Sequence, residues 1–347
     1  MKKVIILGHF AFGKDKANGQ TIKTKIVAQE LIRVYGEEQV TCEDTMGGWK
    51  FLLRLPYILL RMLRHHRHIV VLPAYKGVRV ILPLLTLFNI VFNRRLHYVV
   101  IGGWLPNYVR RFPLLRCSVK ALDHVYVETH HMRDDLLTQG VNNVHVMPNC
   151  KSLDILDPAD LSTTVAEPLA LCTFSRVMQE KGIEDAITAV NAANQHLGHK
   201  AFRLDIYGMV EPGQEEWFST LMRQQPETIS YCGIVPFDQS TTILCNYFAL
   251  LFPTRFLTEG FAGTLIDAMA AGLPPIATDC PSNAELIDNG VNGLLYPMFS
   301  VEPLTQILLN IHLSPDIILN MRSTCLRRAA DFLPQNVIHV LTDNMQE

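Results

Sequence analysis

The segment "YFALLFPTRFLTEGFAGTLIDAMAAGLPPIAT" (Tyr247–Thr278) predicts the architecture of the second half of the chain. An apolar run precedes a polar loop, a helical pattern ends at a glycine and a proline, and a second apolar run follows. Strand, loop, helix and strand in this order indicate a parallel sheet covered by helices. Glu259 and Asp267 lie in the loop and the helix. Because buried carboxylates are costly without partners, the segment predicts a polar ligand at the end of its first strand.

The same alternation extends along all 347 residues, a length that suggests two domains. We expect an α/β protein with two Rossmann-like domains, whose parallel sheets face each other across a cleft. The predicted parts are an N-terminal domain (1–150), a linker with two prolines and several acids (151–168), a C-terminal domain (169–330) and a closing helix (331–347). Five apolar runs predict strands before residue 150 and six predict strands after it: "VIIL", "IVVLP", "HYVVIG", "HVYVE" and "VHVMP", then "LALCTF", "RLDIYG", "ISYCG", "FALLFP", "PPIAT" and "GLLYP".

Composition narrows the class of protein. Hydrophobic residues make up 48% of the chain and charged residues 18%, so large cores can form. The eight cysteines contain no C-x-x-C pair and several lie in apolar runs, which predicts reduced, buried thiols in a cytoplasmic protein. The N-terminal apolar run is short and predicts a first buried strand in preference to a signal peptide. The 14 residues of "VILPLLTLFNIVFN" fall short of the roughly 20 that a membrane span needs, so we expect a buried or interfacial helix.

Charge is distributed unequally between the two halves. Residues 1–150 contain 21 Lys and Arg against 10 Asp and Glu, a net charge of +11, whereas residues 151–347 carry −13. Part of the positive charge lies in "FLLRLPYILLRMLRHHRH" (Phe51–His68), where Arg54, Arg61 and Arg64 can share one helix face if the helix begins near Pro56. This pattern fits a helix on an anionic membrane surface, and it also fits a domain helix with a solvated basic face.

A second motif, "FSRVMQEKGIEDAITAV" (Phe174–Val190), follows the strand "LALCTF". Arg176 lies at the strand end, and Lys181 precedes Gly182 at the start of a helix with apolar residues at i, i+4 and i+7. Two cations beside a helix N-terminus can bind a diphosphate. The alternative is that Lys181 pairs with one of the two acids that follow it, Glu184 or Asp185.

Together these motifs resemble the retaining glycosyltransferases of family four, the group 1 glycosyltransferases with the GT-B fold. The second half matches them in order, from "SRVMQEKG" through "LDIYG", "YCGIVP" and "TEGFAGTLIDAMAAGLPPIATD" to "NAELIDNGVNGLL". In the first half, "NGQTIKTKIVAQEL" (Asn18–Leu31) resembles the family's glycine loop. "VIGGWLPNYVRRFPLL" and "VETHHMRDDLLTQGVNNVHVMPN" resemble members that build capsular and surface polysaccharides.

The resemblance implies roles for particular residues. Arg176 and Lys181 would bind the leaving diphosphate, and Glu259, as the first acid of the E-x7-E motif, would contact the donor sugar. The implied donor-binding residues, by backbone or side chain, are Gly19, Phe261, Ala262, Gly263, Thr264 and Asp267. Asp267 is one methylene shorter than the usual Glu, so its ribose contact is expected to be longer or water-bridged. The family's sugar-contacting histidine has its counterpart in "GGWLPN", centred on Gly103 and Trp104.

The implied activity is a retaining, metal-independent transfer from a nucleotide-diphosphate sugar to a glycan or lipid-linked acceptor in surface polysaccharide biosynthesis. We expect no cofactor, no metal site and no nucleic acid partner, because D-x-D is missing and the histidines ("HHRH", His130–His131) read as solvated loops and helix ends. The expected location is the cytoplasm, with peripheral attachment to the membrane as a further hypothesis. The alternatives are a non-catalytic transferase-like subunit and a GT-B epimerase or phosphorylase. A dinucleotide-binding oxidoreductase is disfavoured because "GHFAFG" lacks the G-x-G-x-x-G spacing.

Overall fold

The computed structural model describes residues 2–12, 19–47, 49–73 and 75–346. The chain divides into two compact units. The first unit comprises Met1–Ser152, Thr258–Phe261 and Phe332–Glu347, and the second comprises Leu153–Leu257 and Ala262–Asp331. The short segment that carries Glu259 therefore belongs to the first unit, although it lies in the second half of the sequence.

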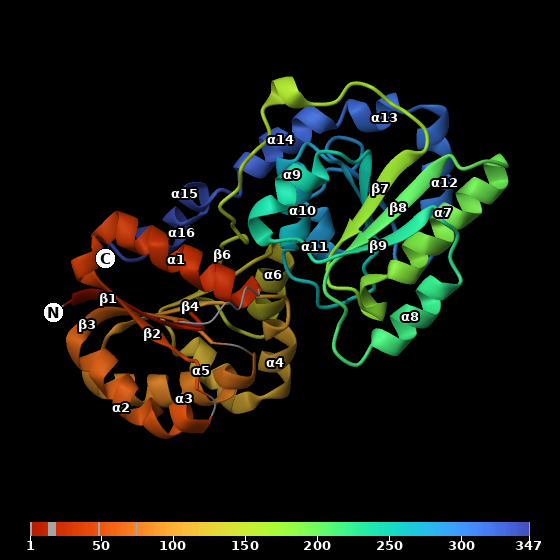
Figure 1. The fold of residues 1–347 in the computed structure, drawn as a ribbon. Helices are drawn as coiled ribbons and strands as arrows, with labels where there is room; N and C mark the ends of the chain where they lie inside the picture. The colour runs from red at the N-terminus through yellow and green to blue at the C-terminus, as the bar shows by residue number, and fades with distance from the viewer. Residues whose placement is uncertain (1, 13–18, 48, 74, 347) are drawn as a thin grey trace. The chain divides into compact units, whose positions relative to one another are not determined.

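The first unit is built on a six-stranded parallel sheet in the order β2-β1-β3-β4-β5-β6 (Figure 1). Its strands are β1 (Lys2–Gly8), β2 (Val40–Asp44), β3 (His66–Leu72), β4 (Arg95–Val99), β5 (His124–Val127) and β6 (Val144–Val146). Its helices are α1 (Gly19–Tyr35), η1 (Glu37–Gln39), α2 (Trp49–His65), α3 (Tyr75–Phe92), α4 (Leu105–Arg111), α5 (Pro113–Lys120), α6 (His130–Thr138), α15 (Pro334–Val337) and α16 (His339–Asp343).

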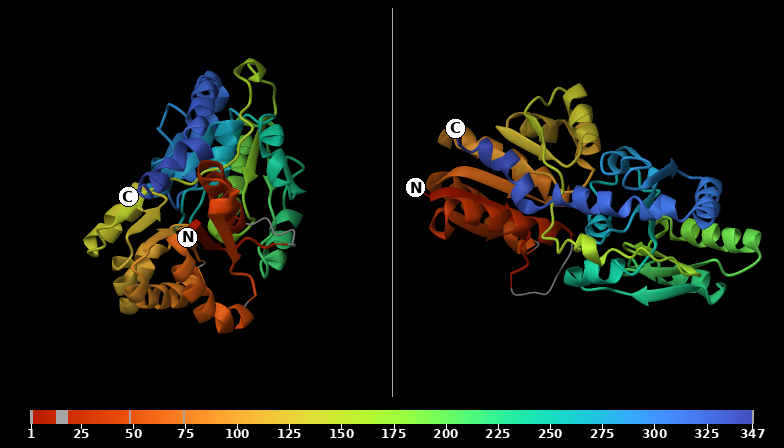
Figure 2. Two further views of the ribbon diagram at one scale, coloured as in Figure 1. Left: turned by 90° about the vertical axis from the view of Figure 1, so that its left-hand side faces the viewer. Right: turned by 90° about the horizontal axis from the view of Figure 1, so that it is seen from above.

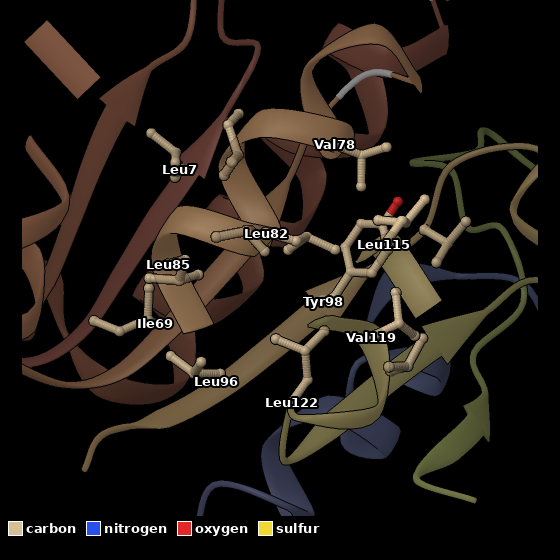
Figure 3. Packing of buried hydrophobic residues seen from close by; sticks show 14 of the residues in the cluster. Leu7, Ile69, Val78, Leu82, Leu85, Leu96, Tyr98, Leu115, Val119 and Leu122 are labelled. Atoms are coloured by element: carbon tan, nitrogen blue, oxygen red, sulfur yellow. The ribbon is translucent and has the colours of Figure 1, made fainter. Parts of the chain in front are cut away.

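Alternating side chains of these strands enter two different cores. Ile5 and Leu7 of β1 pack in the cluster that α2 to α6 complete, while Val4 and Ile6 pack in the cluster that α1, α15 and α16 complete. Figure 3 shows the first of these cores, with Leu82 of α3 and Leu115 of α5 beside the ring of Tyr98. In both views of Figure 2, α16 in blue lies close to the red N-terminal strand. A sheet buried on both faces explains why its strands read as continuous apolar runs.

The second unit contains another six-stranded parallel sheet, in the order β12-β11-β10-β7-β8-β9. Its strands are β7 (Leu169–Phe174), β8 (Phe202–Tyr207), β9 (Ile229–Gly233), β10 (Ala249–Phe252), β11 (Pro275–Asp279) and β12 (Leu294–Pro297). Its helices are η2 (Pro158–Asp160), η3 (Gln179–Lys181), α7 (Ile183–Leu197), α8 (Glu215–Arg223), η4 (Phe237–Gln239), α9 (Ser240–Leu244), α10 (Gly263–Ala270), α11 (Pro281–Ala284), α12 (Glu302–Leu313), α13 (Asp316–Leu319) and α14 (Arg322–Ala330).

All eleven predicted strands are present, and the prediction of five strands in the first half was one short. The missed strand, β2, is an edge strand with the sequence VTCED, so it lacks the apolar run by which the others were recognised. The predicted closing helix was also wrong in detail, because two short helices, α15 and α16, occupy that stretch.

Two further predictions in the first unit need correction. Pro56 lies inside α2, which begins at Trp49 and not near the proline. The histidines of "HHRH" are only partly solvated, because His66 and His68 belong to β3 and are buried there. His130 and His131 do lie exposed at the start of a helix, as predicted. The helical pattern of α2 and the strand pattern of β3 meet without a turn residue, which hid the boundary between them.

The apolar run of "VILPLLTLFNIVFN" is part of α3, an 18-residue helix that is long and apolar enough to cross a membrane by length and composition. Only 22% of that window is buried. Val78, Ile81, Leu82 and Leu85 form the face of α3 that packs on the sheet. The eight cysteines are free, but Cys117 and Cys232 are exposed, so the prediction of buried thiols holds for only part of the set.

Candidate functional site

The second sheet changes direction between β7 and β10. From β7 the chain proceeds to β8 and β9 on one side, and then crosses to β10, β11 and β12 on the other. In open parallel sheets, ligands bind at the carboxyl ends of the strands beside such a switch point. The segments that follow β7 and β10 contain Arg176, Lys181 and Arg255, so three cationic side chains follow these two strand ends.

Arg176 lies just beyond β7 and is paired with an acid. Its Nη1 atom is 2.9 Å from Oε2 of Glu211, which follows β8. Both side chains reach solvent, with 58% of the Arg176 side chain and 30% of the Glu211 side chain exposed. An exposed pair of this kind contributes little to stability and exchanges partners readily.

The loop from Lys181 to Gly182 is fixed against the segment that follows β10. Gly182 has a φ of 69°, and a Cβ atom there would lie 1.9 Å from the carbonyl oxygen of Pro253, so only glycine fits. The Lys181 ammonium lies 5.3 Å from the centre of the Phe252 ring, within cation–π range. Lys181 is thus held where α7 begins, as the sequence predicted.

Arg255, in the loop after β10, forms hydrogen bonds with the segment that follows β7. Its Nε atom donates to Oδ2 of Asp185 at 2.7 Å, a second guanidinium nitrogen donates to Oδ1, and its backbone N–H donates to the carbonyl oxygen of Glu180 at 2.8 Å. The hydrogen bond that Arg255 donates to the Asp185 carboxylate raises the pKa of Arg255. Asp185 is therefore the partner of Arg255, a contact that sequence reasoning missed because the two residues are 70 positions apart.

A pocket of about 160 Å³ opens at the same end of this sheet. Thr264, in the first turn of α10, lines it and donates from Oγ1 to the carbonyl oxygen of Phe174 at 2.7 Å, which fixes the helix start beside the end of β7. The N-terminus of α10 carries a partial positive charge that favours an anion. The lining residues are Phe174, Ser175, Tyr207, Gly208, Ile234, Val235 and Thr264.

Most of these lining residues were not predicted individually. The strand-end motifs "LDIYG" and "YCGIVP" contain four of them, and their position after strands was the available signal. The Tyr207 hydroxyl is hydrogen bonded to that of Tyr247 at 2.8 Å. Burial raises the pKa of Tyr207, so the phenol stays neutral at pH 7.

The predicted donor-binding residues are distributed between the two units. Ala262, Gly263, Thr264 and Asp267 belong to the second unit, where Asp267 lies in α10 and is 5% exposed. Gly19, Glu259 and Phe261 belong to the first unit. Gly19 is the exposed first residue of α1, and the rest of the predicted glycine loop, at Asn18, lies outside the described residues. The roles of these residues in donor binding remain predictions.

The first unit has a larger pocket, of about 350 Å³, at the carboxyl ends of β1, β2 and β3. Its lining combines polar residues that follow the strands with apolar and basic residues of α2 and α3. The lining residues are His9, Gln20, Thr45, Phe51, Leu52, Pro73, Lys76, Gly77, Val80 and Ile81.

Within the described ranges, Glu167, His199 and His312 form a group that could hold a metal ion, with their ligand atoms within 4.8 Å of one another. Glu167 precedes β7, so this group lies at the opposite end of the strand from Arg176. His199 and Glu167 already form an ion-pair contact at 3.0 Å. The group is therefore separate from the candidate donor site.

Comparisons with known proteins find similarity mainly in the second half of the chain. Residues 168–312 match the family model described as "Glycosyl transferases group 1". The GtfA subunit of a UDP-N-acetylglucosamine–peptide N-acetylglucosaminyltransferase of Streptococcus pneumoniae is 29% identical over 182 residues, 52% of this chain and 35% of the relative. The amylovoran biosynthesis glycosyltransferase AmsK of Erwinia amylovora is 25% identical over 155 residues, 44% of this chain and 38% of the relative. The chain thus spans about a third of the length of these two curated relatives.

The fold is shared over the whole chain with a solved structure. The structure of HepE from Anabaena in complex with UDP superposes with a TM-score of 0.76 and covers 99% of each chain at 16% identity. At that identity the likeness concerns the fold, and the family match concerns residues 168–312. Residues 168–312 of the chain therefore resemble the group 1 glycosyl transferases, and the chain as a whole has the GT-B fold.

Proposed function

We propose that the protein is a retaining glycosyltransferase that moves a sugar from a nucleotide-diphosphate sugar to a glycan or lipid-linked acceptor. One observation carries this proposal. Arg176 and Lys181 follow β7 at the switch point of the second sheet, and the pocket at that end of the sheet is lined by Ser175 and by Thr264 in the first turn of α10. Two cations and a helix N-terminus are suited to a diphosphate. UDP is the first nucleotide to test, because the HepE structure contains it.

In the proposed binding mode, the nucleoside occupies the 160 Å³ pocket and its diphosphate lies at the start of α10. Arg176 exchanges the Glu211 carboxylate for a phosphate oxygen. The free-energy cost of breaking the Arg176–Glu211 pair is small because the pair is exposed to solvent. Asp267 binds the ribose hydroxyls and Glu259 contacts the donor sugar. The backbone of Phe261, Ala262 and Gly263 completes the donor contacts.

The proposed reaction breaks the bond between the sugar and the diphosphate and forms a bond to the acceptor oxygen on the same face of the sugar. The acceptor proton passes to an oxygen of the departing diphosphate. Lys181 and Arg176 stabilise the negative charge that develops on that group, which is the task a metal ion performs in other transferases. No cofactor is required for this chemistry.

The acceptor is proposed to bind in the first unit. The 350 Å³ pocket combines His9, Gln20 and Lys76 with apolar side chains such as Leu52 and Ile81. Such a lining suits an acceptor with a hydroxyl-bearing head and an apolar carrier, as in a lipid-linked glycan.

We also propose that the protein attaches peripherally to an anionic membrane through its first unit. Helices α2 and α3 pack beside each other and leave large apolar side chains in solvent, among them Ile90 at 78% and Val91 at 83% exposure. Exposed apolar groups together with basic ones favour an anionic bilayer. The exposed groups on the two helices include Trp49, Leu52, Leu53, Arg54, Tyr57, Leu60, Arg61 and Arg64 on α2 and Tyr75, Lys76, Arg79, Val80, Leu87, Ile90 and Val91 on α3.

Sedimentation with liposomes tests the membrane proposal. We expect binding that needs anionic lipid, weakens with salt and falls when Arg54, Arg61 and Arg64 become Gln. Replacing Lys200, Arg223 and Arg327, three exposed cations of the second unit, by Gln is the matched control. Equal recovery in the supernatant with anionic and neutral liposomes at low salt would contradict membrane attachment.

The activity itself is tested by a screen of binding and hydrolysis across UDP-, GDP- and ADP-sugars. We expect one nucleotide to bind and its sugar conjugate to turn over, with retention of anomeric configuration in the product. Nucleotide binding without any turnover, with and without acceptor glycans, would favour the non-catalytic subunit. Conversion of the sugar in the nucleotide sugar to its epimer, without transfer to an acceptor, would favour an epimerase.

A further inference from the structure

The first unit contains a buried ion pair that the proposed chemistry does not use. Lys23 of α1 and Glu128, which follows β5, approach to 2.6 Å between Nζ and Oε1, and their side chains are only 2% and 3% exposed. Lys23 also donates to the carbonyl oxygen of Val100 at 3.3 Å. A charge pair removed from water in this way needs its remaining hydrogen-bonding capacity satisfied.

The second oxygen of Glu128 is bound to the segment that contains Glu259. Oε2 of Glu128 accepts a hydrogen bond from the backbone N–H of Phe261 at 3.2 Å. The carbonyl oxygen of Phe261 accepts from Nδ2 of Asn149 at 3.2 Å, and its ring lies 4.9 Å from the ring of Phe332. Phe261 is therefore held by its N–H, its carbonyl and its ring, two positions beyond Glu259.

Two glycines, Gly103 and Gly260, show how closely the Thr258–Phe261 segment packs within the first unit. A Cβ atom on Gly103 would lie 2.7 Å from the carbonyl oxygen of Thr258 and 2.8 Å from that of Glu259. A Cβ atom on Gly260 would lie 2.7 Å from Oε2 of Glu128 and 2.8 Å from Cα of Gly102. The space beside Gly260 is thus occupied by protein atoms.

We propose that the Lys23–Glu128 pair anchors the Thr258–Phe261 segment and thereby positions the Glu259 side chain. Lys23, Glu128 and Gly103 are positioning residues, because they act on the backbone around Glu259. This inference rests on the proposed role of Glu259 in donor turnover. Misplacement of a reacting group by about 1 Å can lower turnover by about 100-fold, so an anchor at this point has a measurable effect.

The test uses a variant that removes the anchor while keeping a packed core. In Lys23→Met/Glu128→Leu both charges are replaced by apolar groups of similar size, which often leaves stability unchanged or improved. Neither new side chain can accept the Phe261 N–H. Gly103→Ala is a second, independent variant that displaces the Glu259 carbonyl without altering any charge. Glu30→Gln, which alters an exposed ion pair on the same helix α1, is the control.

Hydrogen exchange of the full, ligand-free chain reports on the anchor directly. We expect amide exchange in the peptide that covers residues 255–262 to accelerate at least tenfold in Lys23→Met/Glu128→Leu and Gly103→Ala, and to stay unchanged in Glu30→Gln. Unchanged exchange in that peptide in both anchor variants would overturn the inference, whatever the activity of the protein.

Turnover of the donor identified in the screen separates positioning from general stability. We expect both anchor variants to bind free nucleotide within about twofold of wild type and to lose about 10- to 100-fold in turnover. Adding Glu259→Gln to either variant should cost no more than Glu259→Gln alone, because both changes act on one group. If the losses in turnover from the anchor variant and from Glu259→Gln were additive, the proposed positioning of Glu259 by the anchor would be wrong. Full turnover in Glu259→Gln alone would instead refute the proposed role of Glu259, and the exchange experiment would still decide whether the anchor exists.

Discussion

Two ion pairs, one in each unit, have similar geometry and opposite surroundings. Lys23 and Glu128 lie 2.6 Å apart with 2% and 3% of their side chains exposed, whereas Arg176 and Glu211 lie 2.9 Å apart with 58% and 30% exposed. The buried pair has no solvent to replace a lost partner, so it can hold backbone in place. The exposed pair can be exchanged for another anion at little cost. Burial, more than distance, therefore separates a pair that can hold backbone in place from a pair whose anion a ligand can replace.

The largest effect is expected from breaking the buried pair on one side only. Lys23→Met leaves the Glu128 carboxylate buried without its cation, which should lower the free energy of unfolding by about 3–5 kcal/mol. Chemical denaturation monitored by circular dichroism measures this change. The double variant Lys23→Met/Glu128→Leu should recover most of the loss. A single variant as stable as wild type would show that solvent reaches the pair.

Breaking the exposed pair should affect turnover and leave stability nearly unchanged. Arg176→Ala and Lys181→Ala are each expected to lower turnover by about 10²–10³, as for other donors that act on developing charge. The midpoint of thermal unfolding should stay within about 2 °C for Arg176→Ala, because an exposed pair contributes about 0–1 kcal/mol. Glu211→Gln, which removes the competing acid, should bind nucleotide as tightly as wild type or more tightly. Steady-state rates of Lys181→Ala within threefold of wild type would exclude its role.

Asp267 extends the comparison to a buried acid on α10. If it binds the donor ribose, Asp267→Ala should weaken nucleotide binding by about 1–3 kcal/mol, because polar partners lose their acceptor. Asp267→Glu should bind nucleotide equally well or better. Isothermal titration calorimetry measures both affinities, and an unchanged affinity in the Ala variant would rule out the contact.

Histidines in the first sheet should make stability depend on pH. His68 Nδ1 and His97 Nε2 lie 3.0 Å apart, both side chains are fully buried, and His97 also contacts the Tyr126 hydroxyl at 3.1 Å. Burial, together with the nearby charges of Arg67, Lys3 and Arg95, lowers the pKa of His68 to about 4. Burial also lowers the pKa of His97 well below its usual value.

The sign of this dependence follows from proton binding. Between about pH 6.5 and pH 4 the unfolded chain binds a proton at His68 that the folded chain does not. The free energy of unfolding should therefore fall by about 1.4 kcal/mol per pH unit for each such histidine as the pH is lowered through this range. Urea unfolding of wild type and His68→Gln at pH 7 and pH 5 measures it, and equal pH dependence in both proteins would contradict the assignment.

The smallest effect is expected from removing divalent cations. Turnover should survive excess chelator, since Arg176, Lys181 and the start of α10 are proposed to stabilise the leaving diphosphate. Complete loss of activity that magnesium or manganese restores would show that a metal ion takes part.

The chain sequence predicted those features that depend on local patterns. Eleven strands were found because each is a short run rich in apolar residues, and α7 was found from its helical period, which begins directly after Gly182. The edge strand β2 was not predicted because its sequence is half polar. The position of His66 and His68 in a buried strand was not predicted because histidine has no strong preference for a buried or an exposed environment.

Contacts between distant residues were decided by the tertiary structure. The order of residues determined that Arg176 and Lys181 follow one strand and that Thr264 begins a helix after another, since strand and helix formation depend on neighbours in sequence. The pairing of Arg255 with Asp185 and the anchoring of Phe261 by Glu128 join residues 70 and 133 positions apart. Such contacts depend on which strand ends the fold brings together and on how deeply each charge is buried. A local sequence pattern determines neither the neighbouring strand ends nor the depth of burial.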